Sequence, residues 1–422
     1  MQMMQMMPIT ASLLLVGCVL VTMALAEPLV RRLPLSPALV YLLCGWLAGL
    51  LVTPPLPDLN LEMQAPLIRL LSEIAVLLSL FAIGLKIRVA ATWLAWRVPV
   101  LLATAGMLWS VALATLVGWL LLPLSWPLAL LLAAMLAPTD PVLASDVQIH
   151  HQDDRDGLRV SLSAEGALND ATAYPVVMLA LGLLGMHELG ENGSRWLMLD
   201  VLWSVTAGAA LGVACGRGLG WALQRKLQAG AQPDWDELLY LGAIALTYGL
   251  ALVFKVSPFL AVFAAGATLL RQHPAAKPEP VARELGQQLQ SFGAHCERLV
   301  EVLMVLLIGA ALPHIIWSPA VLGFAVLMLI LVRPASVLLS LPRSTLPPVQ
   351  RNLAAWFGIR GVGSIFYLTF ALQQGVGGSA AQVLVSACLS CIALSITLHG
   401  ISSTPLMSFY QNHRTSRRKR TV

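Results

Sequence analysis

The sequence predicts an all-α integral membrane protein with about thirteen transmembrane helices, and three observations carry this prediction. Of the 422 residues, 58% are hydrophobic and only 11% are charged, whereas soluble domains carry roughly 25% charged residues. Long apolar runs recur along the chain and are separated by short polar segments. Most of the 26 basic residues lie in alternate connections, as the positive-inside rule requires of a multi-pass protein.

Each expected span is an apolar run with few charges. Several runs are shorter than the roughly 20 residues that a straight span needs, so we expect tilted or broken helices among them. The thirteen expected spans are 10–26, 38–52, 67–85, 99–122, 127–147, 158–184, 197–216, 237–254, 257–270, 298–316, 319–340, 351–374 and 380–403.

The basic residues also predict the orientation. No Lys or Arg precedes the first span, whereas Arg31 and Arg32 follow it. This places the amino terminus outside and the first connection inside, and makes residues 407–422 a short basic cytoplasmic tail. No soluble face gathers the basic residues, which argues against a nucleic-acid partner. The expected partner is membrane lipid, and the expected location is a bacterial inner membrane.

The span count divides the chain into two halves. If span 197–216 is a linker helix, residues 10–184 and 237–403 are two six-helix repeats, one beginning outside and the other inside. They are therefore inverted relative to each other. Inverted repeats with broken helices that meet near the membrane midplane are typical of secondary transporters.

Two interruptions fall in the fifth helix of each repeat. Pro138 and Pro141 lack amide hydrogens, so nearby carbonyl oxygens lose their helical partners and become available to a cation. Asp140 lies where a second half-helix of the same span would begin, and we expect it to cap that half-helix. In span 351–374, glycines including Gly361 flank Arg360 and permit an extended backbone. Two purely structural kinks are the alternative.

The sixth span carries the strongest functional signal. Glu165, Asn169 and Asp170 lie in the middle of an apolar run, and acidic residues at such depth usually serve an ion pathway. Helical spacing places Asp170, Gly166 and Ser163 on one face. Glu165 precedes Asn169 by four residues, so we expect a hydrogen bond between them. We predict that Asp170 carries the ion and that Glu165 supports it; a permanent Asp170–Arg360 pair is the alternative.

Other polar residues receive structural interpretations. Arg69 and Glu73 are expected to pair within span 67–85, and Arg333 is expected to anchor span 319–340 at the interface. His399 is expected to form packing hydrogen bonds. Residues 281–290 are expected to form a separate interfacial helix. Asp146, His150, His151, Asp153, Asp154 and Asp156 form a polar connection that is either solvated or attracts cations.

These motifs occur together in a recognisable order. Thr139-Asp140-Pro, Glu165-x-x-x-Asn169-Asp170 and Phe357-Gly-Ile-Arg360-Gly361 resemble the motifs of the monovalent cation:proton antiporters of the NhaP/NHE type. Leu80 to Leu85, Ser257 to Gly266 and His399-Gly400 add to this resemblance, which runs from about residue 10 to 406. It implies the NhaA/NhaP-like fold.

The resemblance also implies domains and roles. A core domain would comprise residues 99–184 and 319–403, and a dimerisation domain residues 10–85 and 237–316, in a homodimer that moves like an elevator. Asp170 and the Thr139 carbonyl would bind the cation, Asp140 would shape the helix crossing, and Glu165 and Asn169 would form a polar pair near Arg360. Gly166 departs from relatives that place Ser there.

The expected function is exchange of Na⁺, or alternatively Li⁺ or K⁺, for a proton at Asp170. Burial disfavours the empty charged carboxylate, so only the loaded forms would cross the membrane. Asn169 rather than a second acid stands beside Asp170, which predicts a 1:1, electroneutral exchange. A passive channel and a Na⁺-coupled carrier of an organic anion are alternatives. No nucleophile–base pair or phosphate-binding loop suggests an enzyme, and we expect no cofactor.

Overall fold

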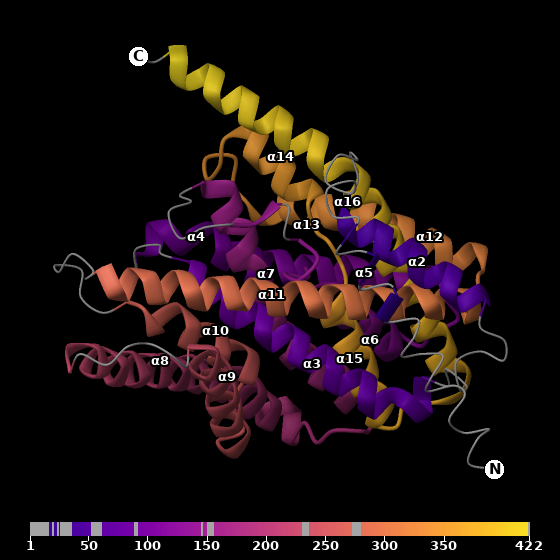
Figure 1. Ribbon diagram of the computed structural model, residues 1–422. Coiled ribbons are helices and arrows are strands. Elements are labelled where there is room, and N and C mark those ends of the chain that lie inside the picture. The colour runs from indigo at the N-terminus through magenta and orange to yellow at the C-terminus, as the bar shows by residue number, and fades with distance from the viewer. Residues whose placement is uncertain are drawn as a thin grey trace.

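The computed structural model describes residues 36–51, 61–87, 92–144, 147–149, 156–229, 236–271 and 280–420, with short pieces at 17–18, 21–22 and 25. Nearly all of the predicted span 10–26, together with Asp146 and residues 150–154, lies outside this part. The described chain is helical and contains no strand (Figure 1). Its α-helices are α2 (Pro37–Leu51), α3 (Leu61–Lys86), α4 (Trp93–Leu101), α5 (Met107–Leu121), α6 (Trp126–Leu136), α7 (Gly157–Leu183), α8 (Ser204–Gln228), α9 (Asp236–Val253), α10 (Pro258–Leu269), α11 (Pro280–Ala311), α12 (Pro319–Leu327), α13 (Arg333–Ser340), α14 (Pro348–Trp356), α15 (Val362–Gln373) and α16 (Gly378–Arg420).

The other twelve predicted spans each match one helix or one pair of helices. Single turns of π-helix at Leu102–Gly106 and Met328–Val332 join α4 to α5 and α12 to α13. A third, at Trp196–Trp203, leads into α8. Among the described residues, five helices are long and apolar enough to cross a membrane, while α2, α6, α9, α10 and α15 are shorter apolar helices. The all-α membrane fold is confirmed.

The prediction for the segment that precedes span 298–316 was wrong. Residues 281–290 are not a separate interfacial helix, because α11 runs without a break from Pro280 to Ala311. Leu285 and Leu289 are buried one turn apart, so this part of α11 packs against the bundle. The segment predicted as a tail begins within α16, which continues past Pro405 and stays helical to Arg420. Near its end, the Arg414 guanidinium lies 2.5 Å from the Asp156 carboxylate.

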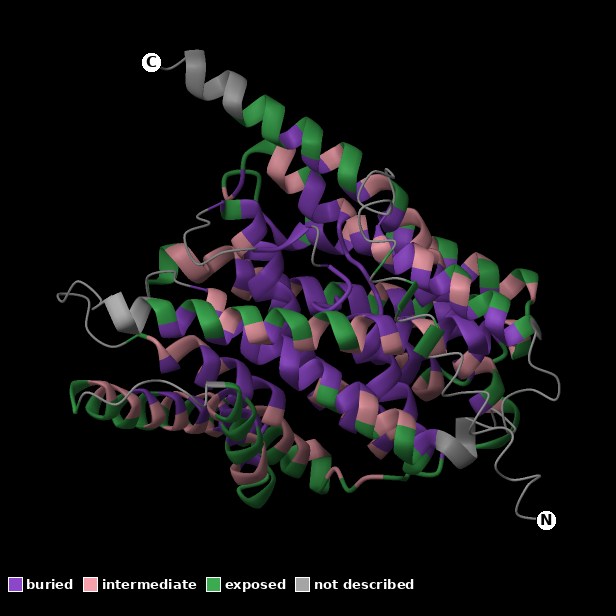
Figure 2. Cartoon of the chain, viewed as in Figure 1, coloured by how far each residue is buried: buried purple, intermediate pink, exposed green. Residues whose placement is uncertain are grey.

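Helix α7 occupies the middle of the molecule and begins at a well-defined cap. One oxygen of the Asp156 carboxylate accepts hydrogen bonds from the amides of Leu158 and Arg159, at 3.0 and 3.1 Å. Such a cap satisfies amides that lack helical partners and places negative charge at the positive end of the helix. Most of α7 is buried, in the central part of the molecule where the purple of buried residues dominates (Figure 2). Its polar residues are therefore held inside the bundle.

Helix α3 crosses the molecule beside α10, α11 and α15 (Figure 1). The predicted pair between Arg69 and Glu73 does not form. Arg69 instead donates to the Gln373 side chain at 2.5 Å and lies 5.0 Å from the ring centre of Phe370. Glu73 accepts a hydrogen bond from the Tyr248 hydroxyl at 2.7 Å. Both side chains therefore link α3 to other helices, to α15 and α9 respectively.

Candidate functional site

Helix α6 ends at Leu136 because of the two prolines that follow it. The amide of Ala137 still donates to the Ala133 carbonyl at 2.8 Å, but Pro138 and Pro141 have no amide hydrogen to continue the ladder. The chain then extends and turns through residue 144. Residues 141–144 form a turn and residues 145–146 lie outside the described part, so the second half-helix expected after Asp140 stays a prediction.

The second interruption separates α14 from α15 and crosses the first. The Asp140 amide donates to the Ile359 carbonyl at 2.7 Å. One oxygen of the Asp140 carboxylate accepts from the Val142 amide at 2.8 Å, and the other accepts from the Val362 amide. Asp140 therefore caps α15, which belongs to the other repeat. A Cβ at Gly361 would run into the Asp140 carboxylate, so the close crossing requires glycine there.

Arg360 makes the reciprocal contact. Its guanidinium is fully buried and donates to the carbonyls of Ala137 and Pro138, the latter at 2.7 Å. These carbonyls follow the carboxyl end of α6, where the helix dipole is negative. The end of each broken helix is thus met by a charge of opposite sign from the other repeat: Asp140 at the positive end of α15, and Arg360 at the negative end of α6. The crossing joins the two predicted interruptions at one place.

Asp170 lies beside this crossing, 1% exposed. Neither of its carboxylate oxygens accepts a hydrogen bond from the described residues. The permanent Asp170–Arg360 pair was therefore the wrong alternative. The Tyr367 hydroxyl donates to the backbone carbonyl of Asp170 at 2.5 Å, which holds α7 against α15. A buried carboxylate without a partner is costly, and such groups mark functional sites in membranes.

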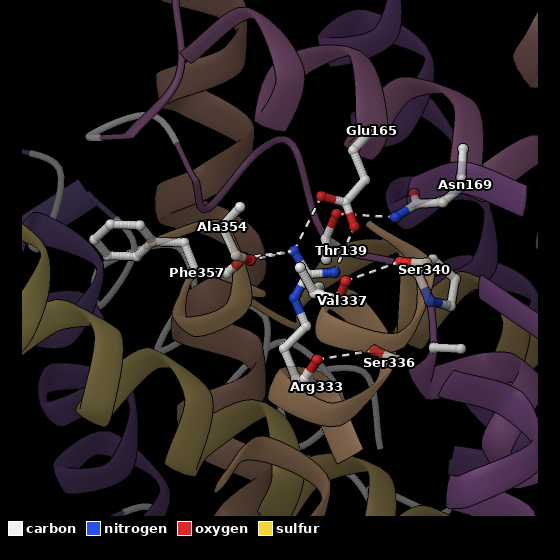
Figure 3. A network of polar contacts seen from close by, with 12 residues as sticks. Thr139, Glu165, Asn169, Arg333, Ser336, Val337, Ser340, Ala354 and Phe357 are labelled. Carbon is white, nitrogen blue, oxygen red and sulfur yellow. Dashed lines mark hydrogen bonds and ion pairs between the residues drawn. The ribbon is translucent and has the colours of Figure 1, made fainter. Parts of the chain in front are cut away.

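Asn169 and Thr139 connect α7 to the first interruption (Figure 3). The Asn169 side-chain amide donates to the Thr139 hydroxyl at 2.9 Å, and its side-chain oxygen Oδ1 has no partner in the described chain. The expected hydrogen bond between Asn169 and Glu165 is not formed. A Cβ at Gly166 would lie 3.4 Å from the Thr139 carbonyl oxygen. Gly166 therefore keeps α7 close to Thr139.

Glu165 pairs with Arg333, whose side chain is buried, so the prediction that Arg333 anchors its span at the interface was wrong. Both carboxylate oxygens of Glu165 accept from the Arg333 guanidinium, the longer contact measuring 3.0 Å. Arg333 also donates to the carbonyls of Ala354 and Phe357, at 3.0 and 2.7 Å (Figure 3). The planar guanidinium has several N–H donors, so it can bind the Glu165 carboxylate and also two backbone carbonyls that lack helical partners at the end of α14. The role of Arg333 was missed because nothing in a helical run predicts which distant carboxylate it meets.

The other predicted residues have supporting positions. Ser163 accepts a hydrogen bond from the Ile149 amide at 3.0 Å, so it holds the segment after the first interruption. His399 contacts the Ser395 and Trp356 carbonyls, at 2.9 and 3.1 Å, as a packing residue would. The structure therefore gathers Asp170, Asn169, Thr139, Asp140 and Arg360 around the crossing, with Glu165 bonded to Arg333 on its flank.

Comparison with known proteins gives one family. The family model described as "Sodium/hydrogen exchanger, transmembrane" matches residues 18–409. The K(+)/H(+) antiporter NhaP of Alkalimonas amylolytica is 26% identical over 408 residues, which cover 94% of this chain and 66% of that protein. The K(+)/H(+) antiporter NhaP2 of Shewanella sp. (strain MR-4) is 24% identical, covering 93% of this chain and 66% of its own.

The fold has a solved counterpart. The sodium proton antiporter MjNhaP1 from Methanocaldococcus jannaschii superposes with a TM-score of 0.70 at 20% identity, and the match covers 95% of this chain and 98% of that one. The likeness supports the predicted NhaA/NhaP-like architecture.

Proposed function

Because the chain belongs to the transmembrane sodium/hydrogen exchanger family, we propose that it is a secondary active transporter that exchanges a monovalent cation for a proton at Asp170. One observation carries this proposal. Among the buried acidic side chains of the described residues, Glu73, Asp140, Asp156 and Glu165 all have partners, whereas both oxygens of Asp170 have none. Asp170 is thus the acid left to bind an ion.

Competition at this carboxylate explains the exchange. Burial disfavours the empty, charged form of Asp170, while a bound proton or cation neutralises it. Only the two loaded forms would then cross the barrier between the two sides of the membrane, one in each direction. The unpartnered oxygen of Asn169 and the Thr139 carbonyl lie near the same crossing and would complete the cation's ligands. No cofactor is needed for this cycle.

The transported cation is proposed to be Na⁺, with Li⁺ and K⁺ as alternatives. The family description names sodium, whereas the two bacterial relatives compared above are described as K(+)/H(+) antiporters. The chain spans 66% of the length of those relatives, so their ion is not transferred to it. A carrier of an organic anion is less compatible with this site, because an unpartnered carboxylate repels anions.

The stoichiometry is proposed to be one cation for one proton. The residue next to Asp170 is the neutral Asn169. The neighbouring acids Asp140 and Glu165 are occupied by backbone amides and by Arg333, respectively. A single carboxylate that alternates between the two ions moves no net charge.

The larger assembly is also proposed. Residues 99–184 and 319–403 would form the moving core, and residues 10–85 and 237–316 the dimerisation domain of a homodimer. The protein would lie in the bacterial inner membrane with its amino terminus outside and its carboxyl terminus in the cytoplasm, as the basic connections suggest.

Purified protein in liposomes tests the proposal. With an imposed proton gradient, a pH-sensitive dye should report proton movement when Na⁺, Li⁺ or K⁺ is added. The half-saturating cation concentration should fall as pH rises, because fewer protons compete. An imposed membrane potential should leave the rate unchanged. Cation flux that ignores the proton gradient would indicate a channel, and a rate that follows the membrane potential would contradict the 1:1 stoichiometry.

A further inference from the structure

Gly363 is the second residue of α15 and faces the carboxylate of Asp170. A Cβ placed on Gly363 would lie 3.0 Å from Asp170 Oδ1, 3.7 Å from its Cγ and 3.8 Å from Oδ2. The 3.0 Å approach is tighter than ordinary van der Waals contact between carbon and oxygen. No side chain therefore separates the backbone of α15 from Oδ1, which is one of the two Asp170 oxygens without a partner in the described chain.

The backbone conformation does not explain why this residue is glycine. Gly363 lies within α15 and is not among the glycines of the described chain that have a positive φ. Glycine in a helix is less stable than alanine by about 1 kcal/mol. A helical glycine at this position is therefore explained by the space beside Asp170 rather than by a left-handed turn.

The helices that border this space are held in place by other contacts. The backbone of α7 is fixed here, because the Tyr367 hydroxyl of α15 donates to the Asp170 backbone carbonyl and the Asn169 side-chain amide donates to the Thr139 hydroxyl. The backbones of α7 and α15, which lie on the two sides of this space, are thus restrained relative to each other. A methyl group on residue 363 would therefore occupy the space beside Oδ1 and press on the Asp170 side chain.

We infer that Gly363 determines which monovalent cations the protein accepts, by leaving room at Asp170 Oδ1 for the larger ones. This inference rests on the proposed exchange at Asp170 and adds the residue that sets its size limit. Removing the space should discriminate by ionic size, since one methyl group in a fitted site typically changes selectivity by roughly 10-fold or more. Protonation, which needs no such space, should be retained.

Gly363→Ala tests the inference, with Gly242→Ala as the matched control. Gly242 lies in α9, and a Cβ there would meet nothing within 4 Å. In liposomes, the half-saturating concentration of the largest cation that the native protein exchanges should rise about tenfold relative to that of Li⁺ in Gly363→Ala. The ratio should not change in Gly242→Ala. Equal changes for all cations, or no change, would overturn the inference.

A second measurement is needed if Gly363→Ala binds cations but no longer exchanges them for protons. Ligands that bind only the folded state raise its melting temperature, so thermal unfolding in Li⁺, Na⁺ and K⁺ reports binding directly. In Gly363→Ala, Li⁺ should still stabilise the protein and the largest cation should lose its effect. Uniform stabilisation, or none by any cation, would overturn the inference. A native protein that exchanges no cation for protons would instead contradict the proposed function.

Discussion

At the scale of single residues, the site separates two buried acids by their partners. Glu165 is bonded on both oxygens to Arg333, which in turn satisfies two backbone carbonyls. The carboxylate of Asp170, five residues later, has no basic side chain and no hydrogen-bond donor as a partner among the described residues. Breaking a buried ion pair from one side leaves an uncompensated charge, which costs about 3–5 kcal/mol. Glu165 is therefore interpreted as structural and Asp170 as the ion carrier.

Glu165→Gln should lower stability through its effect on Arg333. We expect the free energy of unfolding to fall by about 3 kcal/mol, seen as a lower melting temperature of the purified protein. Replacing both members, with Glu165→Gln and Arg333→Met, should recover part of the loss, because no buried charge is then left alone. A single variant as stable as the native protein would contradict the structural interpretation of this pair.

At the scale of helices, the crossing of the two interruptions depends on close backbone approach. Asp140 caps α15 and Arg360 caps α6, so each half-helix end is neutralised by the other repeat. The two segments approach closely at Gly361, where an added Cβ would run into the Asp140 carboxylate. The crossing therefore couples the geometry of both repeats to the position of Asp170 between them.

Gly361→Ala should disrupt this crossing. The added methyl group would displace Asp140 from the end of α15, and overpacking of this kind costs about 1–3 kcal/mol. We expect a lower melting temperature and loss of exchange in liposomes. Gly249→Ala, which adds a methyl group in α9 where nothing lies within 4 Å, serves as the control. Native exchange by Gly361→Ala would show that the crossing tolerates a wider spacing.

At the scale of the whole molecule, α3 and α15 belong to the two proposed domains and are joined by Arg69. Its guanidinium bonds Gln373 and lies over the Phe370 ring. If the domains move relative to each other, this contact must break during each cycle. It then stabilises the arrangement described here relative to the opposite one.

Arg69→Ala should shift the balance between the two arrangements. An exposed cation–π contact contributes about 0.5–1 kcal/mol, so the half-saturating cation concentrations on the two faces of the membrane should change in opposite directions by about 2- to 5-fold. Kinetics with cation supplied to either face of oriented vesicles would measure this. Glu73→Gln, which alters the α3–α9 contact within one proposed domain, should leave the ratio unchanged. Equal changes on both faces would contradict the proposed domain motion.

Much of the fold could be predicted from the sequence, because each membrane span is identified by the hydropathy of its own residues. The two interruptions were predicted as well, since Pro138, Pro141 and the glycines around Arg360 act on their own segments. The contacts across segments could not be predicted in this way. Arg333 meets Glu165, and Arg69 meets Gln373, through packing between helices that lie far apart in the chain. Asp140 caps a helix of the other repeat for the same reason.

The proposal that one carboxylate serves both ions is tested most directly by the protons that a cation displaces. Purified protein in weakly buffered detergent solution would be titrated with the transported cation while the released protons are counted with a pH dye. The native protein and the control Glu73→Gln should release close to one proton per cation bound near neutral pH, and Asp170→Asn should release none. Unchanged proton release by Asp170→Asn would contradict the central claim, because the two ions would then bind at different groups.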